Sequence, residues 1–177
     1  MRKRTTILLL TIATITCWGQ TKEQKEKEDY LKFVFESNLP DNLYHFYNQE
    51  KIRTTYKINQ EINPFYLRGD FDGDKKTDYA LAVIESKTNK KGILIYHTGT
   101  TKYFLAGAGK AMPNGHGDDY PWMDAWEVSD EKNVEQGITD MKPPKLLGEA
   151  ILVQKLESAS GLIYWDGKEY RWYQQGD

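Results

Sequence analysis

The fold is decided by a stretch in which an acidic loop, Asp70-Phe71-Asp72-Gly73-Asp74-Lys75-Lys76-Thr77-Asp78, runs directly into an apolar segment, Tyr79-Ala80-Leu81-Ala82-Val83-Ile84. The apolar segment has no polar residue at alternate positions, which is typical of a strand that is covered on both faces. Gly92-Ile93-Leu94-Ile95-Tyr96-His97 has the same pattern, and the polar residues 85–91 between the two segments fit a hairpin loop. Lys102-Tyr103-Phe104-Leu105 predicts a third strand.

The acidic loop carries the ligand pattern of a hard cation. Its carboxylates stand at loop positions 1, 3, 5 and 9, which are Asp70, Asp72, Asp74 and Asp78. Ca²⁺ takes six to eight oxygens at about 2.3–2.6 Å, and the 1-3-5 spacing lets one turning loop direct alternate side chains inward. Lys76 at position 7 would give its backbone carbonyl, and Gly73 relaxes the turn. Oxygen ligands favour Ca²⁺ over Mg²⁺ or Mn²⁺; an acidic turn without metal is the alternative.

The loop is not a standard EF-hand, because Leu81 stands at position 12 and Lys75 at position 6, where Glu and Gly are preferred. Lys75 would have to adopt a positive φ in such a turn.

The stretch from Leu67 to about Phe104 resembles the integrin-type FG-GAP and bacterial VCBS repeat family. The resemblance lies in Gly69-Asp70-Phe71-Asp72-Gly73-Asp74, Thr77-Asp78-Tyr79-Ala80-Leu81-Ala82 and Gly92-Ile93-Leu94-Ile95-Tyr96. In that family the loop joins neighbouring strands of a propeller blade and holds Ca²⁺, which implies Asp70, Asp72, Asp74, Asp78 and the Lys76 carbonyl as ligands. Since a propeller needs at least about four blades and one repeat is present, the resemblance implies a blade-like sheet inside a smaller domain.

The first 19 residues are typical of a secretory signal peptide. Arg2-Lys3-Arg4 precedes the short apolar run 5–16. This run is too short for a transmembrane helix, which needs ~20 residues, and a short buried helix is the alternative. Cleavage before Gln20 would use Cys17 and Gly19; otherwise Cys17 becomes the lipidated first residue of a lipoprotein. We therefore expect an exported protein, periplasmic or secreted, with no transmembrane helix.

The composition is that of one globular domain. The 177 residues are 28% charged and 39% hydrophobic, as in ordinary folded proteins. The net charge of −2 argues against a nucleic-acid-binding protein, which needs a basic excess. The single cysteine excludes an intrachain disulfide and a zinc site built on cysteine pairs.

The chain after the signal segment predicts an α+β fold, with N-terminal helices packed on a mainly antiparallel, blade-like sheet of about five to seven strands. Residues 20–28 are a charged, solvated segment, either a tether or the start of a helix, and residues 29–177 form the single domain. Apolar residues four apart predict a helix over 30–36. Pro40 ends that helix or begins a second one through Leu43, Phe46 and Tyr47.

Residues 161–174 predict a C-terminal hairpin around Asp166-Gly167, a strong two-residue turn signal. That turn pairs Trp165 with Lys168 and Ile163 with Tyr170. It places Ile163, Trp165, Tyr170 and Trp172 on one face, which we expect to face the core.

The Gly- and Pro-rich segment from Ala106 to Lys145 contains one strand-like stretch, 125–128, and a second group of candidate residues. One interpretation is an acid–base site with His116 as base and Asp119 or Asp124 as acid. Another is a sugar or peptide platform built on Trp122 and Trp126. The third is a polar loop whose tryptophans pack back on the sheet. His97 and His45 are expected to be structural residues.

The function favoured by these patterns is a calcium-binding, non-catalytic envelope or secreted interaction module with a structural ion. Its partner would be a protein or a glycan bound by the segment 106–145. The alternatives are a hydrolase that uses His116 with Asp119 or Asp124, and an inhibitor or immunity-type partner of another exported protein.

Overall fold

The computed structural model describes residues 21–113, 115–129, 131 and 133–176. The chain divides into two compact units, Met1–Val34 and Phe35–Asp177. The predicted signal peptide, including Cys17, lies outside the described residues. Within the described part of the chain, no helix combines the length and apolar character needed to cross a membrane.

Helix α1 (Lys22–Ser37) begins at a reciprocal cap. The Gln24 backbone N–H donates to Thr21 Oγ1 over 3.2 Å, and the Thr21 N–H donates to Gln24 Oε1 over 2.9 Å. This pair satisfies two of the backbone donors that every helix start leaves free. The charge run Lys22–Glu28 is therefore the start of a helix, one of the two structures predicted for it.

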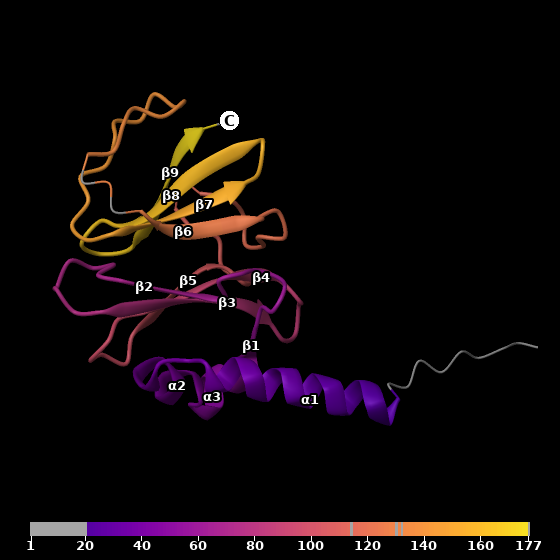
Figure 1. Ribbon diagram of the computed structural model, residues 1–177. Coiled ribbons are helices and arrows are strands. Elements are labelled where there is room, and N and C mark those ends of the chain that lie inside the picture. The colour runs from indigo at the N-terminus through magenta and orange to yellow at the C-terminus, as the bar shows by residue number, and fades with distance from the viewer. Residues whose placement is uncertain (1–20, 114, 130, 132, 177) are drawn as a thin grey trace, which may run out of the picture. The chain divides into compact units, whose positions relative to one another are not determined.

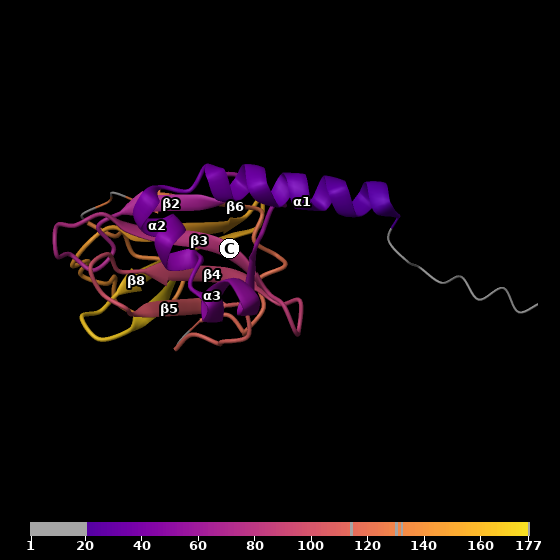
Figure 2. The ribbon, with the colours of Figure 1, turned by 90° about the horizontal axis from the view of Figure 1, so that it is seen from below.

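Two short helices begin the second unit, α2 (Asp41–Tyr47) and α3 (Glu50–Thr55). Pro40 precedes α2 as its N-cap residue, which confirms that this proline begins a second helix. Helix α3 was not predicted. The two helices lie on one face of a sheet (Figure 2). Leu43, Phe46, Tyr47 and Ile52 of these helices are buried in the core cluster on that face.

The first sheet contains β1 (Tyr56–Ile58), β2 (Tyr66–Gly69), β3 (Asp78–Glu85), β4 (Lys91–Tyr96) and β5 (Tyr103–Gly107), all antiparallel. Its order is β1-β3-β4-β5, and β2 pairs with the other half of β3. The three predicted strands are confirmed as β3, β4 and β5. β1 and β2 were missed because they are only three and four residues long.

The second sheet is a four-stranded antiparallel meander, β6-β7-β8-β9. Its strands are β6 (Ala125–Ser129), β7 (Ala150–Lys155), β8 (Ala159–Trp165) and β9 (Tyr170–Gly176). The α+β class with antiparallel sheet is confirmed. The single sheet of five to seven strands is wrong, because the strands divide between two sheets that stack face to face in the second unit (Figure 1).

The two faces of β3 serve two different cores. Ala80 and Ala82 lie in the cluster between the sheets, together with Ile151 and Ile163 of the second sheet. Leu81 and its neighbours on the same face pack with the helices α2 and α3. This double coverage explains why the strand is apolar at every position, and it confirms the prediction made from that pattern.

The C-terminal hairpin forms with a register that differs from the predicted one. Trp165 pairs with Tyr170 and Ile163 with Trp172, so the loop is 166–169 and not Asp166-Gly167 alone. Asp166 closes this longer loop, because its Oδ1 accepts hydrogen bonds from the Lys168 and Glu169 N–H groups, each over 2.8 Å. A shift of two residues keeps every side chain on its face, and the predicted core face is confirmed.

Candidate metal centre

The acidic loop closes the hairpin between β2 and β3, where Gly69 pairs with Asp78. Three of its carboxylates accept hydrogen bonds from backbone N–H groups further along the loop. Asp70 accepts from Gly73 over 2.8 Å and from Lys75 over 3.0 Å. Asp72 accepts from Asp74 over 3.0 Å, and Asp74 from Lys76 over 2.8 Å. These bonds wind the chain around its own carboxylates.

Two residues of the loop have left-handed backbone conformations. Gly73 has φ +82° and Lys75 has φ +69°, so the positive φ expected for Lys75 is confirmed. A Cβ on Gly73 would lie 2.4 Å from the Leu147 carbonyl oxygen. Gly73 is therefore required both by its φ and by the close approach of a second loop.

Asp78, at loop position 9, is 1% exposed and begins β3. Its Oδ2 accepts a hydrogen bond from the Phe71 N–H over 3.2 Å, and its Oδ1 accepts one from the Thr98 N–H over 2.9 Å. Burial raises the pKa of Asp78 to about 6; the Thr98 N–H opposes this rise and the Asp72 charge adds to it. This carboxylate holds the loop against the segment that follows β4.

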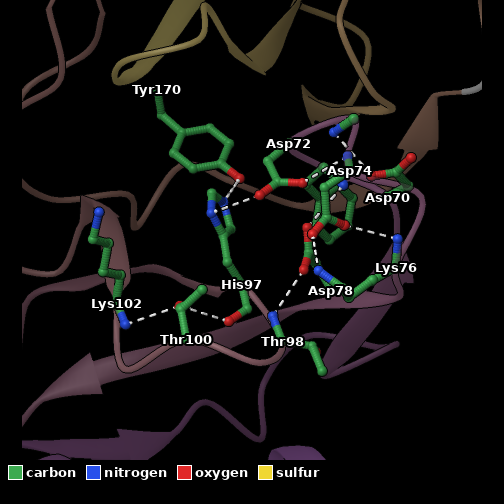
Figure 3. A network of polar contacts seen from close by, with 12 residues as sticks. Asp70, Asp72, Asp74, Lys76, Asp78, His97, Thr98, Thr100, Lys102 and Tyr170 are labelled. Carbon is green, nitrogen blue, oxygen red and sulfur yellow. Dashed lines mark hydrogen bonds and ion pairs between the residues drawn. The ribbon is translucent and has the colours of Figure 1, made fainter.

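His97 lies beside the loop at the end of β4, and it is 5% exposed. Its Nδ1 is 3.2 Å from Asp72 Oδ2, and its Nε2 is 2.6 Å from the Tyr170 hydroxyl (Figure 3). Burial lowers the pKa of His97, against the pull of the Asp72 charge. Because a carboxylate only accepts, Nδ1 is the donor in the neutral ring, and the Tyr170 O–H donates to Nε2. His97 is thus a satisfied structural residue, as expected.

Glu149 joins the loop to the entry of the second sheet. The Asp70 N–H donates to Glu149 Oε2 over 2.6 Å, and the Glu149 N–H donates back to the Asp70 carbonyl over 2.7 Å. Both residues line an open polar cavity of about 370 Å³. Sequence reasoning missed Glu149, because no local pattern marks a contact with a loop 79 residues earlier in the chain.

The carboxylates of the loop and the neighbouring His97 offer two groups of possible ligand atoms. The atoms of each group lie within 4.8 Å of one another. One group contains Asp70, Asp72 and Asp74; the other contains Asp72, Asp78 and His97. The first group is all oxygen and fits a hard cation such as Ca²⁺. Asp72 belongs to both groups. Asp78 and the Lys76 carbonyl as metal ligands stay predictions.

Lys76 supplies a positive charge at the rim of the all-oxygen group. Its Nζ lies 2.5 Å from Asp74 Oδ2. This hydrogen bond holds the pKa of Asp74 below its ordinary value and raises the pKa of Lys76. A cation bound by Asp74 would have to share this carboxylate with the ammonium group or displace it.

The second group of predicted residues is only partly brought together. Asp119 accepts a hydrogen bond from the Lys91 N–H over 2.8 Å, and Asp124 pairs with Lys155 over 3.0 Å. In the described part of the chain, no hydrogen bond or ion pair joins His116 to either aspartate. Both carboxylates therefore hold the segment 106–145 to neighbouring strands, and this geometry gives the acid–base interpretation no support.

The two predicted platform tryptophans have different environments. Trp126 is 3% exposed, and its Nε1–H donates to the Pro64 carbonyl over 2.6 Å. The prediction that Trp126 lies on a binding surface is therefore wrong, because β6 turns this side chain into the core between the sheets. Trp122 is half-buried and contacts His116, with ring centroids 4.5 Å apart.

Comparisons of the chain with protein-family models, with curated proteins and with solved structures gave no match. The resemblance to FG-GAP and VCBS repeats therefore stays a prediction.

Proposed function

We propose that the protein is an exported, calcium-binding interaction module in which the ion has a structural and not a catalytic role. The observation that carries the proposal is the convergence of Asp70, Asp72 and Asp74 oxygens within 4.8 Å of one another in one tight loop. Three carboxylates this close repel one another, and a cation bound among them would remove this repulsion, whereas Lys76 Nζ pairs with Asp74. Export is supported by the basic and apolar pattern of residues 1–19.

The structural role follows from what the loop connects. Asp70 contacts Glu149 at the entry of the second sheet, and Asp72 contacts His97, which contacts Tyr170 of β9. An ion held by the loop would therefore stabilise the junction of the two sheets. Because the side chains of the loop are already bonded to backbone and to one another, few ligand positions would be left for a substrate.

Thermal unfolding of the purified chain beginning at Gln20, in millimolar Ca²⁺ and in chelator, tests the proposal. At a calcium concentration 100 times Kd, binding adds about 2.7 kcal/mol to the free energy of unfolding, a rise in Tm of roughly 5–10 °C. Mg²⁺ and Mn²⁺ at the same concentration should give smaller rises.

Asp72→Asn should abolish the calcium-dependent rise in Tm. Asp118→Asn is the matched control, because Asp118 is a surface carboxylate whose partner is Lys90 and which lies outside the loop. The control should keep the full calcium effect. Equal Tm values of the wild type in calcium and in chelator would remove the basis of the proposal.

A further inference from the structure

A second cavity, of about 280 Å³, lies against the second sheet and is separate from the acidic loop. Its lining comes from the segment 106–145 and from β7, β8 and β9, and consists of His116, Trp122, Lys155, Ala159, Ser160 and Trp172. Most of the lining is apolar, and polar atoms are few. This is the general character of small-molecule sites, although the volume lies just below their usual range of about 300–1,000 Å³.

The apolar walls of the cavity are aromatic rings held at fixed angles. Trp122 and Trp172 have ring centroids 6.0 Å apart with planes at 89°. His116 contacts both indoles, at 4.5 Å and 4.6 Å between centroids. Tyr120, buried behind this corner, contacts Trp122 at 5.2 Å. The two indoles therefore form a corner, and the flat apolar face of each ring is in place before any ligand binds.

The Trp172 indole is held in place by contacts with β8 and β9. A Cβ on Gly161 would stand 2.2 Å from Trp172 Cζ2, so the indole lies directly on the glycine backbone. The Trp172 Nε1–H donates to Gln174 Oε1 over 3.0 Å. The register of β8 and β9 shifts between Ser160 and Gly161, and such bulges are common where a strand redirects a side chain beside a site.

The few polar groups of the lining residues include three that have no hydrogen-bond partner within the described residues. They are the ring nitrogens of His116, the Trp122 Nε1–H and the Ser160 hydroxyl. Together they offer both donors and acceptors. Lys155 is present as well, but its charge is compensated by Asp124 at 3.0 Å. The cavity thus combines a corner of two indole faces with hydrogen-bonding groups that both donate and accept.

We propose that this cavity binds a single pyranose ring, the terminal unit of a glycan. The ring would place its apolar C–H face on an indole and its hydroxyls toward His116, Ser160 and Trp122. Hydroxyls both donate and accept, as these partners require, whereas an aromatic carboxylate only accepts. An organic cation would find no carboxylate among the described residues that line the cavity. This proposal specifies the partner of the proposed interaction module and so rests on that function, but it does not need the bound calcium.

The expected affinity is low. A ligand of about a dozen non-hydrogen atoms with ordinary binding efficiency has a Kd of about 1 mM. Binding is best followed by the indole N–H resonances in ¹H–¹⁵N spectra of the chain beginning at Gln20, titrated with glucose, N-acetylglucosamine and glucuronic acid. At least one sugar should shift the Trp122 indole resonance in a saturable way, in calcium and in chelator alike.

Two variants test the site. Trp122→Leu should weaken sugar binding at least tenfold, because it removes one wall of the corner. Gly161→Ala should weaken it similarly through displacement of the Trp172 indole. Trp165→Leu is the matched control, since Trp165 is also half-buried but lies at the other end of β8. It should leave the Kd within twofold, with folding of each variant checked by its melting curve.

Two results would overturn the proposal. One is the absence of saturable shifts with all three sugars up to 50 times the expected Kd, roughly 50 mM. The other is saturable binding of indole-3-acetate or choline where the sugars do not bind, which would assign the cavity to an aromatic acid or a cation. Sugar binding without any calcium effect on Tm would refute the calcium proposal and leave this one standing.

Discussion

Asp78 should make the stability of the calcium-free protein depend on pH. Burial raises its pKa from 3.8 to about 6 in the folded state. Since a tenfold change in proton affinity corresponds to about 1.36 kcal/mol, ionised Asp78 costs the folded state about 3 kcal/mol. The folded chain binds this proton more tightly than the unfolded chain. The stabilisation of the fold by the protonated Asp78 carboxyl is therefore complete below pH 3.8 and is lost as the pH rises through 6.

The substitution Asp78→Asn isolates this contribution. Asparagine has the shape of the protonated acid, and it loses one acceptor for the Phe71 and Thr98 N–H groups, at a cost of about 1 kcal/mol. In chelator, the variant and the wild type should therefore be nearly equal in stability at pH 4.5. At pH 7.5 the variant should be more stable by about 2 kcal/mol.

Urea unfolding followed by tryptophan fluorescence at a series of pH values measures this difference directly. Taking the difference between the two proteins removes the opposite contribution of His97, whose lowered pKa makes stability rise with pH near 6.5. Saturating calcium should reverse the order at pH 7.5, because the ion favours ionised Asp78. A stability difference that stays constant from pH 4.5 to 7.5 in chelator would refute this account of the buried carboxylate.

Two further substitutions test the packing around the loop and the core. Gly73→Ala should lower the free energy of unfolding by at least about 2 kcal/mol and weaken calcium binding, because φ is +82° and the new Cβ would meet the Leu147 carbonyl. Gly99→Ala, with φ +81° and nothing within 4 Å, should show only the backbone cost of about 1 kcal/mol, and equal losses would contradict the contact. Trp126→Phe should cost about 1–3 kcal/mol in urea unfolding, since the buried Trp126 side chain loses its hydrogen bond to the Pro64 carbonyl and part of its ring; an unchanged midpoint would show that neither contributes.

Local patterns were sufficient for much of the fold. The unbroken apolar run of β3 predicts coverage on both faces, and the structure has α2 and α3 on one side and the second sheet on the other. The alternation in the C-terminal hairpin assigns its core face correctly although the turn is longer than predicted, because the side-chain period of two survives a shift of two residues. The positive φ of Lys75 also follows from its position in the loop.

The division of the strands into two sheets could not be predicted, since no local pattern shows that β5 and β6, which residues 108–124 connect, do not pair. The long-range contacts of the candidate metal centre could not be predicted either. The aspartate spacing is local and marks the loop, whereas the Glu149 contact to Asp70 and the Tyr170 contact to His97 join segments 79 and 73 residues apart.

The two tryptophans of the Gly- and Pro-rich segment show the same limit. Spacing alone does not distinguish Trp122, which lines a cavity, from Trp126, which fills the core. The amino-acid sequence by itself determined β3, β4, β5, the C-terminal hairpin with its core face and the acidic turn, because these depend on neighbours a few residues apart. Only the tertiary structure decided which side chains meet across the two sheets, because burial and contact at that range come from packing of the whole chain.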